Sequence, residues 1–254
     1  MQESDSQVGR PEDNPVDFVK QISSRGGDYR EALLDASKNG HEEITRLLYE
    51  KIKDIHGGCI DTSLLNIAMH EASANGRENI VKFLLSKGAN NYNTSMLRAS
   101  YAGHMSIVDL MLERGADNYD HCMALAAESG KLQLIEKMIL LGGRGFAWAL
   151  RCAAYGGHID SIKILVSSCD KNDYNEAMQQ ASVHGWEDIV RLLLQHGANE
   201  YNRSLVHAVN HGHINLVVLL LESGATNLEY CLGLSKIDEI SNILKQAING
   251  KVKL

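Results

Sequence analysis

Three histidines in the C-terminal half of this 254-residue chain are the first candidates for chemistry. His207 and His211 stand four residues apart, which places them on one face of a helix, and His184 precedes His211 by one repeat length. Imidazole nitrogens bind zinc, which needs three or four ligands, and they titrate near neutral pH. No cysteine or carboxylate has an obvious place to complete a zinc site, so we predict no metal. A pH-sensitive contact surface and a merely exposed polar face stay open.

Two further motifs suggest catalysis or nucleotide binding but lack the necessary context. Cys152 and His158 suggest a thiol nucleophile with its base, yet they fall on opposite sides of an expected helix-ending turn, without an oxyanion loop. The segment Gly142-Gly-Arg-Gly145 suggests a phosphate loop, but no strand precedes it and no Lys-Ser/Thr pair ends it. We therefore predict that the chain is not an enzyme and uses no cofactor.

Composition and charge exclude further classes. Hydrophobic residues make up 44% and charged residues 22%, as in folded proteins, and no apolar run is long enough to span a membrane. The net charge is −7 without a basic stripe, which disfavours nucleic acid as a ligand. Five cysteines without a C-x-x-C pair favour a reducing compartment. We expect a monomeric, intracellular, cytoplasmic protein without membrane or nucleic-acid partners.

A sequence repeat organises most of the chain. A glycine, often followed by histidine, recurs at intervals of 36, 27, 27, 27, 28 and 27 residues. Alanine stands four residues before each of these glycines and leucine or methionine seven before, and an apolar pair follows four and five residues after most of them. The repeat glycines are Gly40, Gly76, Gly103, Gly130, Gly157, Gly185 and Gly212.

These offsets predict two short helices in each repeat, such as residues 94–101 and 106–114. The repeat glycine ends the first helix, where a positive φ is favoured, and a second glycine closes the second. Polar residues just before the first helix are expected to be its N-caps. They are Asn93, Asp120, Asn175 and Asn202. Because no single repeat can bury its own apolar face, neighbouring repeats must stack.

This pattern resembles the ankyrin repeat. Residues 99–116 and 208–225 follow the family pattern A-A-x-x-G-H-x-x-I-V-x-x-L-L-x-x-G-A, and seven units fit it over residues 28–225. The resemblance implies an all-α fold, an ankyrin-type α-solenoid of stacked helix-turn-helix repeats.

The repeat is shorter than that family's usual repeat of about 33 residues. The five residues between Gly115 and His121 are too few for a projecting β-hairpin, so we expect reduced or absent hairpin fingers. An aromatic residue, mostly tyrosine, stands eleven residues before most repeat glycines and is expected to fill the space under the missing hairpin. The short repeats resemble the shortened ankyrin repeats of giant DNA viruses and some protists.

The sequence also predicts how the ends are organised. Residues 1–13 are expected to be a disordered acidic tail, and residues 14–27 a capping helix with Pro15 at its first position. The 36-residue interval predicts an insertion loop over residues 51–62. Residues 226–254 are expected to form a truncated C-terminal capping repeat.

In the ankyrin family, the two residues before the repeat glycine line a concave groove and contact partners. Tyr101 and Tyr155 occupy such positions, and aromatic and arginine side chains are typical interface anchors. Alternatively, these residues merely cover the helix ends. The full set of predicted partner-binding residues is Arg98, Tyr101, Glu128, Trp148, Arg151, Tyr155, His184, His207 and His211.

We therefore expect a non-enzymatic scaffold that recognises an unidentified protein partner through the concave helix face. One alternative is a pH- or metal-responsive binding module that uses His184, His207 and His211. Another is a substrate-recruiting adaptor that acts with another subunit.

Overall fold

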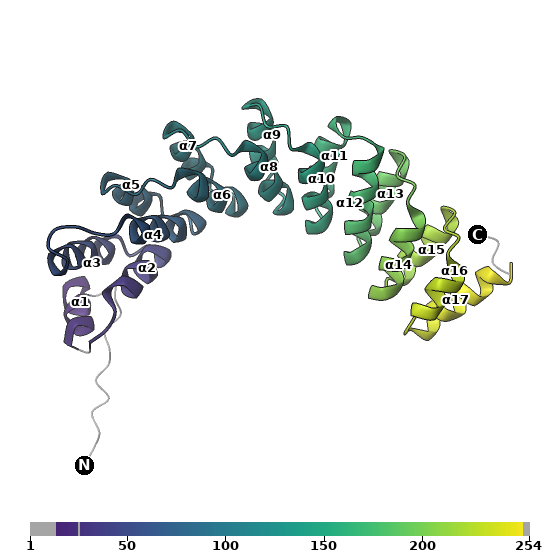
Figure 1. Ribbon diagram of the computed structural model, residues 1–254, viewed down its shortest axis with the longest axis horizontal. Coiled ribbons are helices and arrows are strands. Elements are labelled where there is room, and N and C mark those ends of the chain that lie inside the picture. The colour runs from purple at the N-terminus through teal and green to yellow at the C-terminus, as the bar shows by residue number, and fades with distance from the viewer. Residues whose placement is uncertain (1–13, 25, 251–254) are drawn as a thin grey trace, which may run out of the picture. The chain divides into compact units, whose positions relative to one another are not determined.

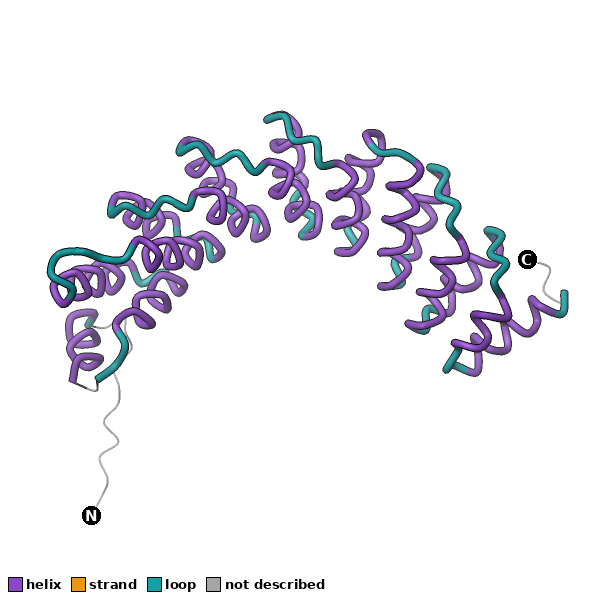
Figure 2. The backbone as a smooth tube through the Cα atoms, in the orientation of Figure 1, coloured by secondary structure: helices purple, strands orange, loops and turns teal. Residues whose placement is uncertain are grey.

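The structure, a computed structural model, describes residues 14–24 and 26–250. All regular elements of this described part are helices, joined by short loops (Figures 1 and 2). The described residues form two compact units divided between Asn118 and Tyr119. The acidic tail expected over residues 1–13 lies outside the described part.

Unit 1 contains a first, single helix and three helix pairs. The first helices of its pairs, α2, α4 and α6, pack on one another in order, and the second helices, α3, α5 and α7, do the same. The helices are α1 (Pro15–Ser24), α2 (Tyr29–Asn39), α3 (Glu42–Ile55), α4 (Thr62–Ala74), α5 (Glu78–Ser86), α6 (Tyr92–Ala102) and α7 (Met105–Glu113).

Unit 2 repeats the same pairing. Its first helices α8, α10, α12, α14 and α16 pack in order, and a 3-10 turn over Val166–Ser168 extends the second helix α11. The helices are α8 (Tyr119–Glu128), α9 (Leu132–Leu140), α10 (Phe146–Gly156), α11 (Ile159–Leu165), α12 (Lys171–His184), α13 (Glu187–Gln195), α14 (Tyr201–His211), α15 (Ile214–Glu222), α16 (Leu228–Leu234) and α17 (Asp238–Ile248).

The periodic apolar positions form the core of each unit. In α6 and α7, Met96, Ala99, Ile107, Val108 and Met111 are fully buried, and the equivalent residues of other repeats are buried too. The alanine lets neighbouring first helices approach closely, because helix pairs pack at distances set by their contact side chains. The predicted all-α fold of stacked helix pairs is therefore confirmed within each unit.

The repeat glycine ends the first helix in the left-handed conformation. Gly103 has φ of 90°, and its backbone N–H donates to the carbonyl oxygen of Ala99. A residue with a Cβ is strained at such a φ, which explains why glycine recurs at this position.

The expected N-caps have another role. Asn93 lies inside α6, which begins at Tyr92, while Asn91 caps the helix by accepting from the Thr94 N–H. The Oδ1 atom of Asn93 instead accepts from the backbone N–H groups of Asp117 and Asn118, at 2.9 and 3.3 Å, in the loop that follows α7. The prediction that Asn93, Asp120, Asn175 and Asn202 are N-caps is therefore wrong.

These four side chains and that of Asn66 each brace the next loop by accepting two backbone N–H bonds, and we call the five residues the loop braces. Such bonds satisfy donors that a β-hairpin finger would otherwise have to pair. The braces and their donors are Asn66 with Asn90 and Asn91, Asn93 with Asp117 and Asn118, Asp120 with Arg144 and Gly145, Asn175 with Asn199 and Glu200, and Asn202 with Thr226 and Asn227.

Two repeats lack a brace, and an aspartate caps the next helix in both cases. Arg30 and Ala147 hold the brace position in the first and fifth repeats. The helix after the first repeat is capped by Asp61, which accepts from Ser63 N–H, and the helix after the fifth repeat begins with a capping box formed by Asp170 and Asp173. The loop amides are therefore satisfied by a local cap where the brace is missing.

The predicted insertion loop over residues 51–62 is wrong in its first part, because α3 continues to Ile55. Its extra turn stays helical since Leu48, Tyr49 and Ile52 extend the buried apolar stripe. The ring of Tyr49 meets that of Phe83 in α5 edge-on, with centroids 5.5 Å apart. The extra residues of this repeat thus lengthen a packed helix, and a short loop remains before Thr62.

Candidate functional site

The residue after the repeat glycine connects neighbouring repeats. The side chains of Arg77, Trp186 and His213 each contact the backbone carbonyl two residues before the preceding repeat glycine: Lys38 at 3.1 Å, Tyr155 at 3.3 Å and Val183 at 3.0 Å. The rings of His104 and His158 lie over Gly76 and Gly130 in the same way, leaving no space for a Cβ there. Since three different chemical groups make this contact, the position builds the frame and carries no shared chemistry.

Tyr155 is the most prominent predicted binding residue of unit 2. It lies near the end of α10 and is 50% exposed. Its ring meets the His184 ring of α12 edge-on, with centroids 4.6 Å apart, and its carbonyl oxygen accepts the Trp186 indole N–H. Trp186 is itself exposed. These contacts across two repeats hold an aromatic surface cluster, which consists of Tyr155, His184 and Trp186.

Trp148 and Arg151 lie on the same helix as Tyr155 and contact different neighbours. The Trp148 ring meets the His121 ring of α8 edge-on at 4.4 Å. The Arg151 Nη1 atom pairs with a carboxylate oxygen of Glu176 in α12 at 2.5 Å, and both side chains stay partly exposed. Arg151 is therefore an arginine already paired within the unit, and a partner would meet the Arg151–Glu176 pair rather than a free cation.

Glu128 lies where two first helices approach closely. Its carbonyl oxygen would be 2.1 Å from a Cβ at Gly156, so only glycine permits this approach of α8 and α10. Burial raises the pKa of the nearby Cys152 thiol to about 11, and the Glu128 carboxylate adds to the rise. Cys152 is thus a protonated thiol at neutral pH, which makes it a poor nucleophile.

His207 and His211 are neighbours on α14. The Nδ1 atom of His211 lies 3.0 Å from the His207 carbonyl oxygen, and the His211 ring stacks on that of His213 with centroids 6.1 Å apart. Burial lowers the pKa of His207, and the charge of His211 lowers it further. Within the described part of the chain, no three His, Cys, Asp or Glu side chains gather to hold a metal ion. His184 instead lies against Tyr155, so the metal-responsive alternative has no ligand set there.

The Gly142–Gly145 loop has its amides occupied by its own unit. The N–H groups of Arg144 and Gly145 donate to Asp120 Oδ1 at 2.6 and 3.0 Å, and the Gly143 N–H donates to the Met138 carbonyl. A phosphate would compete with a carboxylate for the same donors, so the loop is a connection between repeats.

In unit 1, the two predicted binding residues lie one helical turn apart on α6. Tyr101 is 51% exposed and Arg98 is exposed as well. Arg98 lies close enough to His70 of α4 to lower the pKa of that imidazole, although burial is the larger cause. Together Arg98 and Tyr101 offer one cation and one aromatic ring on the first-helix layer of this unit.

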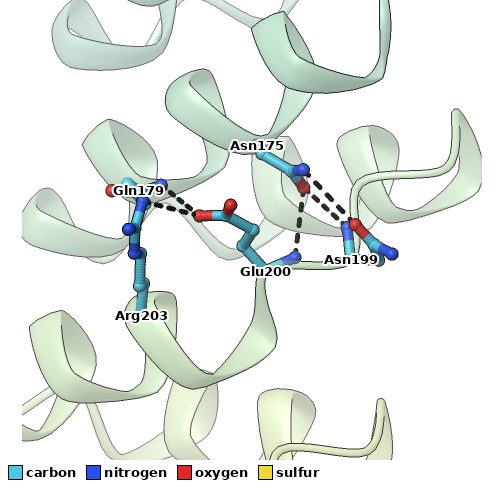
Figure 3. A network of polar contacts seen from close by, with 5 residues as sticks. All are labelled: Asn175, Gln179, Asn199, Glu200 and Arg203. Carbon is cyan, nitrogen blue, oxygen red and sulfur yellow. Dashed lines mark hydrogen bonds and ion pairs between the residues drawn. The ribbon is translucent and has the colours of Figure 1, made fainter.

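The structure adds exposed residues and one network that the sequence reasoning missed. Figure 3 shows Asn175 and Gln179 of α12 reaching Asn199 and Glu200 of the next repeat, where Arg203 joins Glu200. The Glu200 carboxylate accepts from Gln179 at 3.0 Å and pairs with Arg203 at 3.1 Å. Apart from this network, exposed Ile67 and Tyr230 stand at the helix position of Trp148. The wide variation of residue type at that position was the signal available for finding them.

None of the described helices combines the length and the apolar character needed to cross a bilayer.

Comparison with known proteins identifies the family. The family model described as ankyrin repeats (3 copies) matches the sequence over residues 12–96, 33–121 and 150–230, which together cover more than half of the chain. No curated protein is significantly similar to the chain. Among solved structures, the crystal structure of the human ASB11 ankyrin repeat domain matches with a TM-score of 0.56 and 22% identity, over 73% of this chain and 98% of that domain. At this identity the match concerns the fold alone.

Proposed function

Because the chain belongs to the ankyrin repeat family, we propose that it is a non-enzymatic scaffold that binds a protein partner through the exposed side chains of its first helices. Ankyrin repeats are generally protein–protein interaction modules, and their first helices line the concave groove to which the family's partners bind. The residue two positions before the repeat glycine differs between repeats, and Tyr101 and Tyr155 are about half exposed there, so these side chains are available for recognition.

The observation that carries the proposal is the cluster of Tyr155, His184 and Trp186. Tyrosine and tryptophan anchor interfaces because they bury a large area at a small entropic cost, and here contacts across two repeats fix their position before binding. Glu128, Trp148, Arg151, His207 and His211 extend the proposed surface of unit 2. Arg98 and Tyr101 form a separate proposed contact in unit 1.

Site-specific photo-cross-linking tests the location of the surface. A photo-reactive phenylalanine replaces Tyr155 in one variant and Leu140 in a control, because Leu140 ends the second helix α9 and is 87% exposed. We expect one recurrent protein adduct from the Tyr155 position and none of that mass from Leu140. Adducts from Leu140 alone would place the contact on the second helices and contradict the proposal.

A second candidate function is a pH-dependent contact at the histidines of unit 2. It is favoured by the lowered pKa of His207 beside His211, because protonating both would place two like charges on one helix turn. The captured partner's affinity, measured between pH 5.5 and 7.5, tests this role. Affinity that is flat with pH, or equally pH-dependent in a His207→Gln, His211→Gln variant, would exclude it.

A further inference from the structure

The helix α2 is the earliest of the stacked first helices in unit 1, and one of its sides is not covered by another described first helix. The helix α4 packs on α2 and α6 packs on α4, so each later first helix covers the preceding one. Within residues 14–24 and 26–250, no first helix of a preceding repeat lies on the other side of α2, and α1 packs mainly on the second helix α3 (Figure 1). A cavity of about 390 Å³ opens there, between α1, α2 and the start of α3. We call it the α2 groove.

The floor of the α2 groove is apolar, and the residues that α2 contributes to it are small, as they are where first helices pack on one another. Phe18 and Ile22 of α1 and Ile44 of α3 line it together with Ala32 and Ala36 of α2. In the next repeats the positions equivalent to Ala32 and Ala36 are also small, and they are fully buried in helices that pack on their neighbouring first helices. They are Ala68, Ala72, Ser95 and Ala99. The groove therefore has the surface on which this fold seats a first helix.

The rim of the α2 groove is acidic. Asp28, Glu31 and Asp35 line it at helical spacing, and Asp28 is committed to capping α2 by accepting from the Arg30 N–H. Glu31 and Asp35 are exposed, and within the described residues no ion pair joins either of them to a cation. A helix that lies in the groove would bring its polar edge beside these two carboxylates, which favours lysine or arginine there.

Charge also decides between possible occupants. Residues 1–13 carry four carboxylates against one arginine, and a second copy of the chain carries a net charge of −7. Both would meet the acidic rim with charge of the same sign. We propose that the α2 groove binds a basic amphipathic helix of a partner protein, which packs its apolar face on Ala32 and Ala36 and pairs its cations with Glu31 and Asp35. This site is separate from the surface proposed above.

A designed peptide tests this proposal on the full chain. The probe is a fluorescein-labelled 16-residue helix with alanine and leucine on one face and lysine on the other, and the matched peptide has glutamate in place of each lysine. Fluorescence anisotropy is measured for the wild type, for Glu31→Lys with Asp35→Lys, and for a control, Glu113→Lys with Glu222→Lys, which changes exposed carboxylates elsewhere by the same charge. Melting curves verify that each variant folds.

We expect the lysine peptide to bind the wild type and the control variant within twofold of each other and the groove variant at least tenfold more weakly. Ala32→Phe, which fills the groove without changing charge, should weaken binding to a similar extent. Equal loss in both charge-reversal variants, or tight binding of the glutamate peptide to the wild type, would reduce the effect to general attraction or apolar adhesion and overturn the proposal.

A photo-reactive residue in place of Asn39, which also lines the groove, identifies the occupant directly. An adduct with the lysine peptide supports the proposal. An adduct within one chain to residues 1–13, or between two copies, in preference to the peptide would assign the groove to that occupant and overturn it. Failure of this site leaves the photo-cross-linking at Tyr155 unaffected, so the two proposals are tested independently.

Discussion

The side chain of Asn175 holds the loop that begins the next repeat, because its Oδ1 atom accepts the backbone N–H of Asn199 at 2.7 Å and that of Glu200 at 3.1 Å. The same arrangement recurs in four other repeats at a separation of 24 and 25 residues. In each of these five repeats, one side-chain oxygen thus takes over the pairing of two loop amides. This explains how repeats of 27 residues can stack without a hairpin finger.

Removing a loop brace should destabilise unit 2. Asn175 is 6% exposed, and Asn175→Ala leaves two loop N–H groups without their acceptor, at a cost of about 1–3 kcal/mol. Asn175→Asp keeps the acceptor, as Asp120 does in another repeat, but it loses the Nδ2 donation to Asn199 and buries a charge, so it should recover only part of the loss. Urea denaturation measures the difference, with exposed Asn210→Ala as the control. An Asn175→Ala variant as stable as the control would show that the brace contributes nothing.

The position after the repeat glycine should accept any side chain that donates at the right distance. Trp186→His introduces the residue that already makes this contact in the next repeat, as His213, so we expect a loss below about 1 kcal/mol. Trp186→Ala removes both the donor and the ring over Gly157 and should lose about 2–4 kcal/mol in total. Thermal denaturation of the two variants in parallel tests the ranking. The opposite order would contradict the structural role assigned to Trp186.

A methyl group at residue 156 should force α8 and α10 apart. The Cβ of Gly156→Ala would lie 2.1 Å from the Glu128 carbonyl oxygen, and backbone atoms cannot move aside as a flexible side chain does. We expect a loss of about 1–3 kcal/mol. Gly233→Ala is the matched control, since Gly233 is also helical and its Cβ would meet no atom within 4 Å. Equal stability of the two variants would mean that the helices do not approach as closely as described.

The stability of unit 1 should fall as the pH drops below about 6.5. Burial, followed by the charge of Arg98, lowers the pKa of His70 in the folded chain below the ordinary histidine value of 6.5. The unfolded chain therefore binds more protons in this window. The neutral imidazole stabilises the fold fully above pH 6.5, and this stabilisation is lost as the pH falls towards the folded pKa. Denaturation curves between pH 5 and 8 should show a shallower dependence for His70→Gln than for the wild type, while exposed His196→Gln retains the wild-type slope.

Periodicity predicted most of the fold because it fixes which faces are buried. The alanine of each repeat and the apolar pair of most repeats reappear as the core, and the repeat glycines end the first helices with positive φ, as at Gly103. The role of Asn93 was not predictable from local rules. An asparagine near a helix start satisfies the capping pattern equally well, and only the position of the next loop shows that its oxygen is used there. The extension of α3 was not predicted because the interval between repeat glycines gives the number of inserted residues but not whether they continue a helix.

Less of the candidate site than of the fold could be predicted from the sequence. Exposure of Tyr101 and Tyr155 follows from the repeat register. The edge-on contact of Tyr155 with His184 and the pairing of Arg151 with Glu176 depend on helix spacing that the sequence does not specify. The open side of α2 was hidden for the same reason. The sequence indicates a helix before the first repeat but not that it covers α3 in preference to α2.

The affinity of the captured partner for a Tyr101→Ala, Tyr155→Ala variant tests the central claim most directly, with Leu140→Ala as the control. Both tyrosines are about half exposed, so their truncation should leave the melting curve nearly unchanged. Binding measured by calorimetry should weaken by about 2 kcal/mol or more in the double variant and stay unchanged in the control. Wild-type affinity in a folded double variant would contradict the claim that the first-helix face recognises the partner.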